Sequence, residues 1–274
     1  MSEKHVSEMT PDELLACAPC DFLGFAKLAK EPIFNECQIH GKYQVVFEHH
    51  PICPVCAEEQ TQKLRAEQLR QHERERDIAR YAASGVPSRY QHAGLKNFEI
   101  RNDGQRRARD AIARYARSVT ENHSGGLILS GRTGTGKTHL AIALLRNVMR
   151  QIPGRTPMFA RYITSADLAD HLLDAWKRPD DSTEATRLRM CDPELLVIDE
   201  YGLDDRKEVR TEAVHRVMYD RYDAKKPTIL ISNESPESLQ KMLGQRLWSR
   251  LNDGGELIQF NWEDQRAGVR HETE

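Results

Sequence analysis

The feature that most constrains this chain is a glycine-rich segment that follows a short apolar run, residues 127–129. It matches the phosphate-loop pattern G-x-x-x-x-G-K-[ST] at every fixed position and consists of Gly131, Arg132, Thr133, Gly134, Thr135, Gly136, Lys137 and Thr138. Such glycines let backbone amides turn toward phosphate oxygens, and the following helix adds partial positive charge at its amino terminus. The segment predicts an ATP site in which Lys137 holds the β- and γ-phosphates and Thr138 places its hydroxyl on Mg²⁺.

The surroundings of this segment indicate the fold. Beyond residue 89 the chain alternates apolar runs with helical patterns. The runs that resemble buried strands are residues 127–129, 158–160, 195–198 and 228–231, and the helical patterns are residues 137–151, 166–177 and 208–223. Alternation of this kind predicts an α/β fold with a parallel sheet covered by helices on both faces.

Polar residues follow two of the predicted strands. Asp199 and Glu200 come directly after the run 195–198, and Asn233 comes soon after the run 228–231. Sites in parallel sheets lie at the carboxyl ends of the strands. We therefore expect Asp199 to bind Mg²⁺, Glu200 to act as general base for the attacking water, and Asn233 to orient that water. The alternative for Asn233 is an asparagine that only forms a turn.

Composition narrows the class of protein. The chain has 274 residues, 30% of them charged, and a formal net charge of −2. With no long apolar run and no secretory signal in residues 1–10, we expect a cytoplasmic protein without a membrane span. In that compartment the six cysteines are expected to be thiols or metal ligands. Contact with nucleic acid would require a local basic surface, because bulk charge does not supply one.

Four residues near the amino terminus have the spacing of zinc ligands. Cys37-x2-His40 and Cys53-x2-Cys56 form two close pairs. Three thiolates and one imidazole favour a closed, structural Zn²⁺ site over a site for Mg²⁺ or Ca²⁺. Some alternatives stay open from the sequence: a neighbouring histidine replaces His40, or an additional cysteine pair replaces one of these pairs, binds a second metal or binds none. The residues concerned are His49, His50, Cys17 and Cys20.

These patterns divide the chain into three predicted parts. Residues 1–56 would form the zinc-binding module, and residues 57–88 a charged linker helix in which both signs alternate. That helix is expected to end near residue 84, because Gly85 and Pro87 follow. Residues 89–274 would form the ATPase domain.

Taken together, the motifs resemble the AAA+ ATPases, and in particular the DnaC/DnaI helicase loaders and the related IstB transposition ATPases. The resemblance rests on the phosphate loop, the Asp199–Glu200 strand and the strand before Asn233. It is supported by the less generic stretches 84–90, 95–98, 244–250 and 260–266, and it covers about residues 84–268. The stretch 260–266 is similar to the carboxyl-terminal tail of DnaC-type loaders.

The resemblance implies further residues and partners. Arg250 would act as an arginine finger in the site of a neighbouring subunit, with Arg246 as the less favoured candidate, and Arg266 would be the arginine called sensor 2. A finger in trans implies self-association through the ATPase domain. The region that holds Trp176, Lys177, Arg178, Arg187 and Arg189 would lie where loaders carry a helix for single-stranded DNA.

The resulting hypothesis is a loader of a replicative DnaB-type helicase onto single-stranded DNA in replication initiation. In this hypothesis the zinc module holds the helicase, and ATP hydrolysis releases the loader. One alternative is an IstB-like ATPase that assists a transposase on target DNA. A second is a zinc-containing DNA adaptor that binds nucleotide and hydrolyses little of it.

Overall fold

The computed structural model describes residues 28–47, 53–121, 125–150, 156–175, 183–203 and 208–265. They belong to two compact units, Met1–Arg74 and Glu75–Glu274, which are described here one after the other. The predicted domain boundaries at residues 56 and 88 stay predictions.

The first unit contains an antiparallel hairpin of β1 (Leu28–Cys37) and β2 (Gly41–Phe47). The strands pair through Asn35 with Tyr43 and Cys37 with Gly41, and Gly41 adopts a φ of 77°, which closes the turn. The sequence shows little strand periodicity after residue 30, and this hairpin was not predicted from it. None of the hairpin residues 34–44, whose burial the structure describes, is buried, so no apolar alternation marks the two strands.

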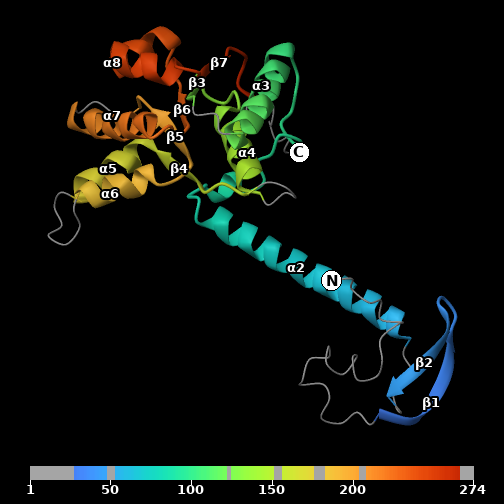
Figure 1. Cartoon of the computed structure of the whole chain (residues 1–274). Helices are drawn as coiled ribbons and strands as arrows, with labels where there is room; N and C mark the ends of the chain where they lie inside the picture. The colour runs from blue at the N-terminus through green and yellow to red at the C-terminus, as the bar shows by residue number, and fades with distance from the viewer. Residues whose placement is uncertain are drawn as a thin grey trace, which may run out of the picture. The chain divides into compact units, whose positions relative to one another are not determined.

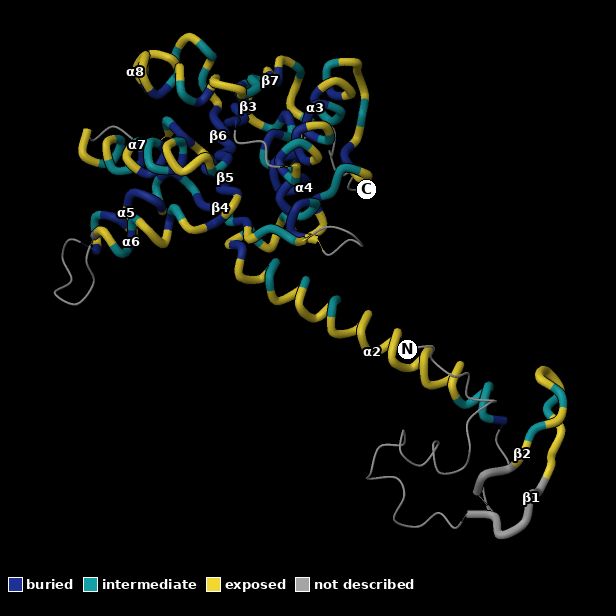
Figure 2. Tube along the Cα trace, viewed as in Figure 1, coloured by how far each residue is buried: buried dark blue, intermediate teal, exposed yellow. Residues whose placement is uncertain are grey.

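The long helix α2 (Pro54–Ala82) contributes to both units and has no buried residue. Figure 2 shows the exposed colour along most of its length. The predicted charged helix is therefore present, and it begins three residues earlier than the predicted start at residue 57. It stops before Ser84, whose hydroxyl donates to the carbonyl oxygen of Tyr81, and Gly85 then takes a φ of 77°.

The second unit is built on a parallel five-stranded sheet with the strand order β4-β5-β6-β3-β7 (Figure 1). The strands are β3 (Leu127–Gly131), β4 (Ala160–Thr164), β5 (Leu195–Tyr201), β6 (Thr228–Ser232) and β7 (Glu256–Phe260). Since all five run in the same direction, their carboxyl ends share one edge of the sheet. The predicted α/β class is confirmed.

Helices cover both faces of this sheet, as Figure 1 shows. On one face, α3 (Asp103–Thr120) and α4 (Lys137–Met149) pack over Leu129 and Val197. On the other, the alternate strand residues Ile128 and Ile198 pack under α5 (Ser165–Ala175), α7 (Glu208–Asp223) and α8 (Pro236–Asn252). The short helices η3 (Ser88–Tyr90) and α6 (Thr183–Cys191) complete the described part of the unit.

Two differences from the predicted elements have physical causes. The strand expected at residues 158–160 is displaced to β4, an edge strand in which Ala160, Tyr162 and Ile163 are buried and Arg161 is half-buried. Phe159, which precedes it, is 38% exposed. The strand β7 was not predicted, because it is the opposite edge strand and only Ile258 and Phe260 of it are buried.

A fully buried arginine fixes the starts of two central strands. Arg221 of α7 donates hydrogen bonds to Thr228 and to the carbonyl oxygens of residues 191, 193, 194 and 227. Burial lowers the pKa of Arg221 to about 10. Because these acceptors lie at or just before the starts of β5 and β6, Arg221 supports the register of both strands.

Candidate nucleotide and metal sites

The phosphate loop connects β3 to α4, as the sequence predicts. Gly131 has a φ of 133°, and a Cβ there would lie 2.3 Å from the carbonyl oxygen of Phe260 on β7. Gly136 caps α4 with a φ of 93°, and a Cβ there would lie 2.6 Å from the ring of Phe98. Within the loop, the hydroxyl of Thr135 donates to the carbonyl oxygen of Arg132 at 2.7 Å. Glycine at 131 and 136 is thus required by backbone conformation and by close neighbours.

Lys137 is the buried cation of this loop. Its side chain is 5% exposed, and its Nζ donates to the carbonyl oxygens of Gly131 and Arg132 at 2.6 and 2.7 Å. It stands at the first residue of α4, where backbone N–H groups have no partner inside the helix. The ammonium group and the helix terminus together form a site suited to an anion with several oxygens.

The acidic pair lies beside the loop, at the end of β5. Asp199 is 4% exposed, and its Oδ2 accepts a hydrogen bond from Thr138 Oγ1 at 2.9 Å. Glu200 has a φ of 58° at a register irregularity between Ile198 and Tyr201, and its backbone N–H donates to Asp199 Oδ1 at 2.7 Å. Such an irregularity turns a side chain out of the regular alternation. The buried carboxylate is therefore joined to the loop, and the next one is exposed at the rim.

Tyr162 completes the surroundings of Asp199 and was not predicted. This residue of β4 is 4% exposed, and its hydroxyl donates to Asp199 Oδ2 at 2.8 Å. Burial, followed by the nearby charge of Asp199, raises the pKa of Tyr162 well above its ordinary value, so the phenol is a donor at neutral pH. No local sequence signal identifies this role, because Tyr162 reaches Asp199 only through the pairing of β4 with β5.

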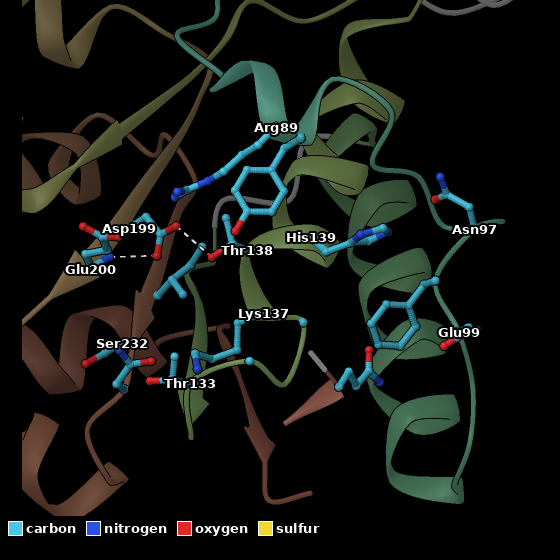
Figure 3. A pocket seen from close by; sticks show the side chains of 17 residues that line it. Arg89, Asn97, Glu99, Thr133, Lys137, Thr138, His139, Asp199, Glu200 and Ser232 are labelled. Carbon is cyan, nitrogen blue, oxygen red and sulfur yellow. Dashed lines mark hydrogen bonds between the residues drawn. The ribbon is translucent and has the colours of Figure 1, made fainter. Parts of the chain in front are cut away.

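These elements surround a cavity of about 550 Å³, shown in Figure 3. Its lining includes the predicted residues Thr133, Gly134, Gly136, Lys137, Thr138, Asp199, Glu200 and Asn233. Of the predicted loop residues, Gly131, Arg132 and Thr135 are outside the lining. Some lining residues were not assigned to the site from the sequence. They are His139 of α4 and five residues that precede α3: Arg89, Tyr90, Asn97, Phe98 and Glu99. The lining combines the two kinds of group that a magnesium–nucleotide site needs. A lysine can bind phosphate, and carboxylate and hydroxyl oxygens are the ligands that Mg²⁺ prefers.

A carboxyl-terminal segment also reaches this cavity. Because β7 pairs with β3, the residues after Phe260 leave the sheet beside the phosphate loop. The indole N–H of Trp262 donates to the carbonyl oxygen of Thr135 at 2.9 Å, and the backbone N–H of Gln265 donates to that of Gly134 at 3.1 Å. Gln265 lines the cavity. Arg266, predicted to act beside the nucleotide, lies outside the described residues.

Arg250 lies away from this cavity within its own chain. Its guanidinium is 3.2 Å from Asp223, and it lies over the rings of Tyr219 and Tyr222 at 5.0 and 4.9 Å. Arg246 lies over Tyr219 at 5.7 Å. Neither arginine belongs to the cavity lining. Both are carried by α8.

The basic residues predicted near the DNA helix are only partly described. Trp176, Lys177 and Arg178 lie outside the described residues. Arg187 pairs with Glu184 and Asp220, and Arg189 donates to Thr186 at 2.8 Å. The geometry leaves their role on DNA a prediction.

The predicted zinc ligands come together in the first unit. The ligand atoms of Cys37, His40, Cys53 and Cys56 all lie within 4.8 Å of one another. The Nδ1 of His40 is 3.8, 3.7 and 3.3 Å from the three sulfur atoms, and the sulfurs of Cys37 and Cys56 are 3.6 Å apart. A tetrahedron with Zn–S bonds of about 2.3 Å separates its sulfurs by about 3.8 Å. The four side chains therefore fit a zinc ion.

The surroundings of these ligands affect their protonation and orientation. The backbone amides of His40 and Ile39 lower the pKa of Cys37 to about 6, which favours the thiolate that binds metals. The hydrogen bond with Cys37, followed by burial, raises the pKa of Cys56 to about 11, because both favour its protonated thiol. The Nε2 of His40 is 3.5 Å from Glu59, a carboxylate that would orient the imidazole. Cys17, Cys20, His49 and His50 lie outside the described residues.

No helix in the described part of the chain is both long and apolar enough to span a bilayer.

Comparison with known proteins agrees with this geometry. The family model described as "IstB-like ATP binding protein" matches residues 58–253. The chain is 30% identical over 189 residues to "Replicative helicase loader DnaC" of Buchnera aphidicola subsp. Schizaphis graminum, a match that covers 68% of this chain and 74% of the relative. It is 28% identical to the protein of the same description from Escherichia coli K12, with the same coverage.

A solved structure shares the fold. The "Crystal structure of the DnaC helicase loader" superposes with a TM-score of 0.57 at 24% identity, over 64% of this chain and 99% of that one. The second unit therefore has the AAA+ P-loop core expected from the sequence.

We expect the purified chain to contain about one zinc ion, because the four ligands leave no open position. Substitution Cys56→Ser should remove most of the metal. The zinc content of each purified protein is measured by inductively coupled plasma mass spectrometry. Cys191→Ser is the matched control, because Cys191 lies outside the cluster and should leave the zinc content unchanged. Full zinc content in Cys56→Ser would contradict the assignment.

Proposed function

Because the chain belongs to the family of IstB-like ATP-binding proteins, we propose that it is an ATP-dependent loader of a DnaB-type replicative helicase. It would place the helicase on single-stranded DNA in replication initiation, and ATP hydrolysis would release the loader. Two relatives that carry the description of helicase loader support this role over 68% of the chain. The observation that carries the ATPase part is the hydrogen bond between Thr138 and Asp199, which joins the phosphate loop to the acidic strand.

The side chains around the cavity have distinct proposed roles. Lys137 and the amides of the loop bind the β- and γ-phosphates, and Thr138 and Asp199 hold Mg²⁺. The bound cation would neutralise charge on the phosphates. Glu200, exposed at the rim, accepts a proton from the attacking water. Asn233 also lines the cavity, where its amide orients that water.

We further propose that Arg250 completes the site of a neighbouring copy. Its position outside the cavity of its own chain, beside Asp223 and two tyrosines, supports a role in trans. Assembly through the ATPase domain would then be a condition for rapid hydrolysis. Arg266 is proposed to contact the nucleotide from the same chain.

The zinc-binding module is proposed to hold the helicase. Its hairpin exposes large apolar side chains, with Phe34 67% and Ile39 78% exposed, beside the four candidate metal ligands. An apolar patch on a small unit suits a protein partner.

The competing function is that of an IstB-like ATPase that assists a transposase, and the family description is the observation that favours it. We expect the chain to co-purify with a tagged DnaB-type helicase of the same host in the presence of ATP and single-stranded DNA. Cys56→Ser should weaken that capture, whereas Cys191→Ser should not. Capture of the transposase and not of the helicase would establish the competing function instead.

Substitution Glu200→Gln should lower the rate of ATP hydrolysis by about 10²-fold or more, because it removes a general base. Binding of ATP should change little, since Glu200 is at the rim and the loop is intact. Steady-state phosphate release, with helicase and single-stranded DNA present, provides the measurement. Glu212→Gln, on the exposed surface of α7, is the control. Equal rates in wild type and Glu200→Gln would favour the adaptor that hydrolyses little ATP.

Mixing two inactive variants tests the role of Arg250. Lys137→Ala and Arg250→Ala should each be about 10³-fold slower than wild type or worse. A mixture should regain activity, because an intact phosphate loop in one chain meets an intact arginine in the next. Arg246→Ala should behave as wild type. An inactive mixture, or a larger loss in Arg246→Ala, would overturn the assignment.

A further inference from the structure

We propose that Tyr162 is a positioning residue that orients the Asp199 carboxylate for Mg²⁺. The inference rests on the proposed magnesium–nucleotide site and adds to it a residue from the edge strand β4. Within the described part of the chain, Asp199 is the only hydrogen-bond partner of the Tyr162 hydroxyl, at 2.8 Å from Oδ2.

The hydrogen bonds on Asp199 are distributed unequally between its two oxygens. Oδ2 accepts from two hydroxyls, Tyr162 at 2.8 Å and Thr138 at 2.9 Å, whereas Oδ1 accepts from the backbone N–H of Glu200 at 2.7 Å. A carboxylate offers about two lone pairs on each oxygen. Oδ2 is therefore fully used, and Oδ1 keeps a lone pair for a cation or for a water bound to it.

Tyr162 is the donor that fixes this orientation. The terminal torsion of an aspartate is broad, so its carboxylate turns easily unless its oxygens are held. The backbone N–H of Glu200 and the hydroxyl of Thr138 belong to parts of the site that are proposed to contact the ligand. Tyr162 is buried at 4% exposure and does not line the cavity. Its hydrogen bond is thus shielded from solvent.

The backbone around Tyr162 is itself well anchored. Tyr162 pairs with Val197 in the parallel register of β4 and β5, two residues before Asp199. Its N–H donates to the carbonyl oxygen of Ser84 at 2.7 Å. A Cβ added to Gly85, in the segment after α2, would lie 2.6 Å from the Tyr162 carbonyl oxygen, so this segment is in tight contact with β4. The backbone that carries the phenol is therefore held on both sides, by β5 and by the segment after α2.

The test compares Tyr162→Phe with Tyr115→Phe. Tyr115 is also a buried tyrosine, at 3% exposure, but its hydroxyl donates to the carbonyl oxygen of Gly125. Both substitutions remove one buried hydroxyl and keep the ring. Affinity for ATP is measured by calorimetry on the full chain, once with Mg²⁺ and once with a chelator of divalent ions. The ratio of the two affinities reports the contribution of the metal and requires neither hydrolysis nor helicase.

In Tyr162→Phe we expect this ratio to fall by about tenfold, since residues that orient a metal ligand typically contribute that much. The Mg²⁺ concentration for half-maximal binding should rise correspondingly, and the affinity without metal should stay within about twofold of wild type. Tyr115→Phe should keep the wild-type ratio. A loss of affinity that is equal with and without Mg²⁺ is a packing defect and overturns the proposal, as does an unchanged ratio in Tyr162→Phe.

The same measurements separate this inference from the proposed function. Wild-type protein whose affinity for ATP gains nothing from Mg²⁺ would refute the magnesium–nucleotide site, and with it the role of Tyr162. Wild-type protein that gains affinity with Mg²⁺ but binds no helicase would refute the loader only. If Tyr162→Phe has a lower melting temperature than Tyr115→Phe, the ratio still decides, because a general loss of stability affects both affinities alike.

Discussion

The pairing of β3 with β6 on one side and β7 on the other is the constraint on which the rest of the site depends. Parallel pairing places the carboxyl ends of β3, β5 and β6 at one edge, where the phosphate loop, the acidic pair and Asn233 meet around one cavity. Pairing with β7 brings the following residues against the loop, where Trp262 donates to Thr135. The site is thus a product of strand order, and the register supported by Arg221 contributes to it from the opposite ends of the strands.

The two units obtain stability from different sources. The second has apolar layers on both faces of its sheet, which is the ordinary way to offset the conformational entropy lost on folding. The hairpin of the first unit leaves Phe34 and Ile39 exposed, and its Cys37 and His40 meet Cys53 and Cys56 at the start of α2. In a unit this small, a metal bound by these ligands would supply stability that an apolar core supplies in larger domains. We therefore propose different roles for the two units. The second unit binds the nucleotide, and the first unit, stabilised by metal, offers its exposed apolar side chains to a partner.

Much of the fold and the nucleotide site could be predicted, because their signals are local. Alternating apolar runs and helical patterns were enough for the α/β class, and helix 208–223 was predicted with the bounds that α7 has. The two edge strands of the sheet, β4 and β7, were harder to predict. At β4 the half-buried Arg161 interrupts the buried residues, which displaced the predicted strand, and β7 has only two buried residues, Ile258 and Phe260. The hairpin was missed because strands without a packed face show no apolar alternation.

The sequence by itself predicted the chemistry: a phosphate loop with Lys137 and Thr138, a carboxylate pair at Asp199 and Glu200, and four candidate metal ligands at paired spacing. Each is a short motif whose function depends on residue type and spacing. Residue type and spacing can both be read from the sequence without knowledge of the fold. Only the tertiary structure decided which distant residues serve these motifs. Tyr162 reaches Asp199 across two paired strands, Glu59 approaches His40 from a helix, and Gln265 enters the cavity beside β3. Contacts of this kind depend on strand order and packing, which no local pattern encodes.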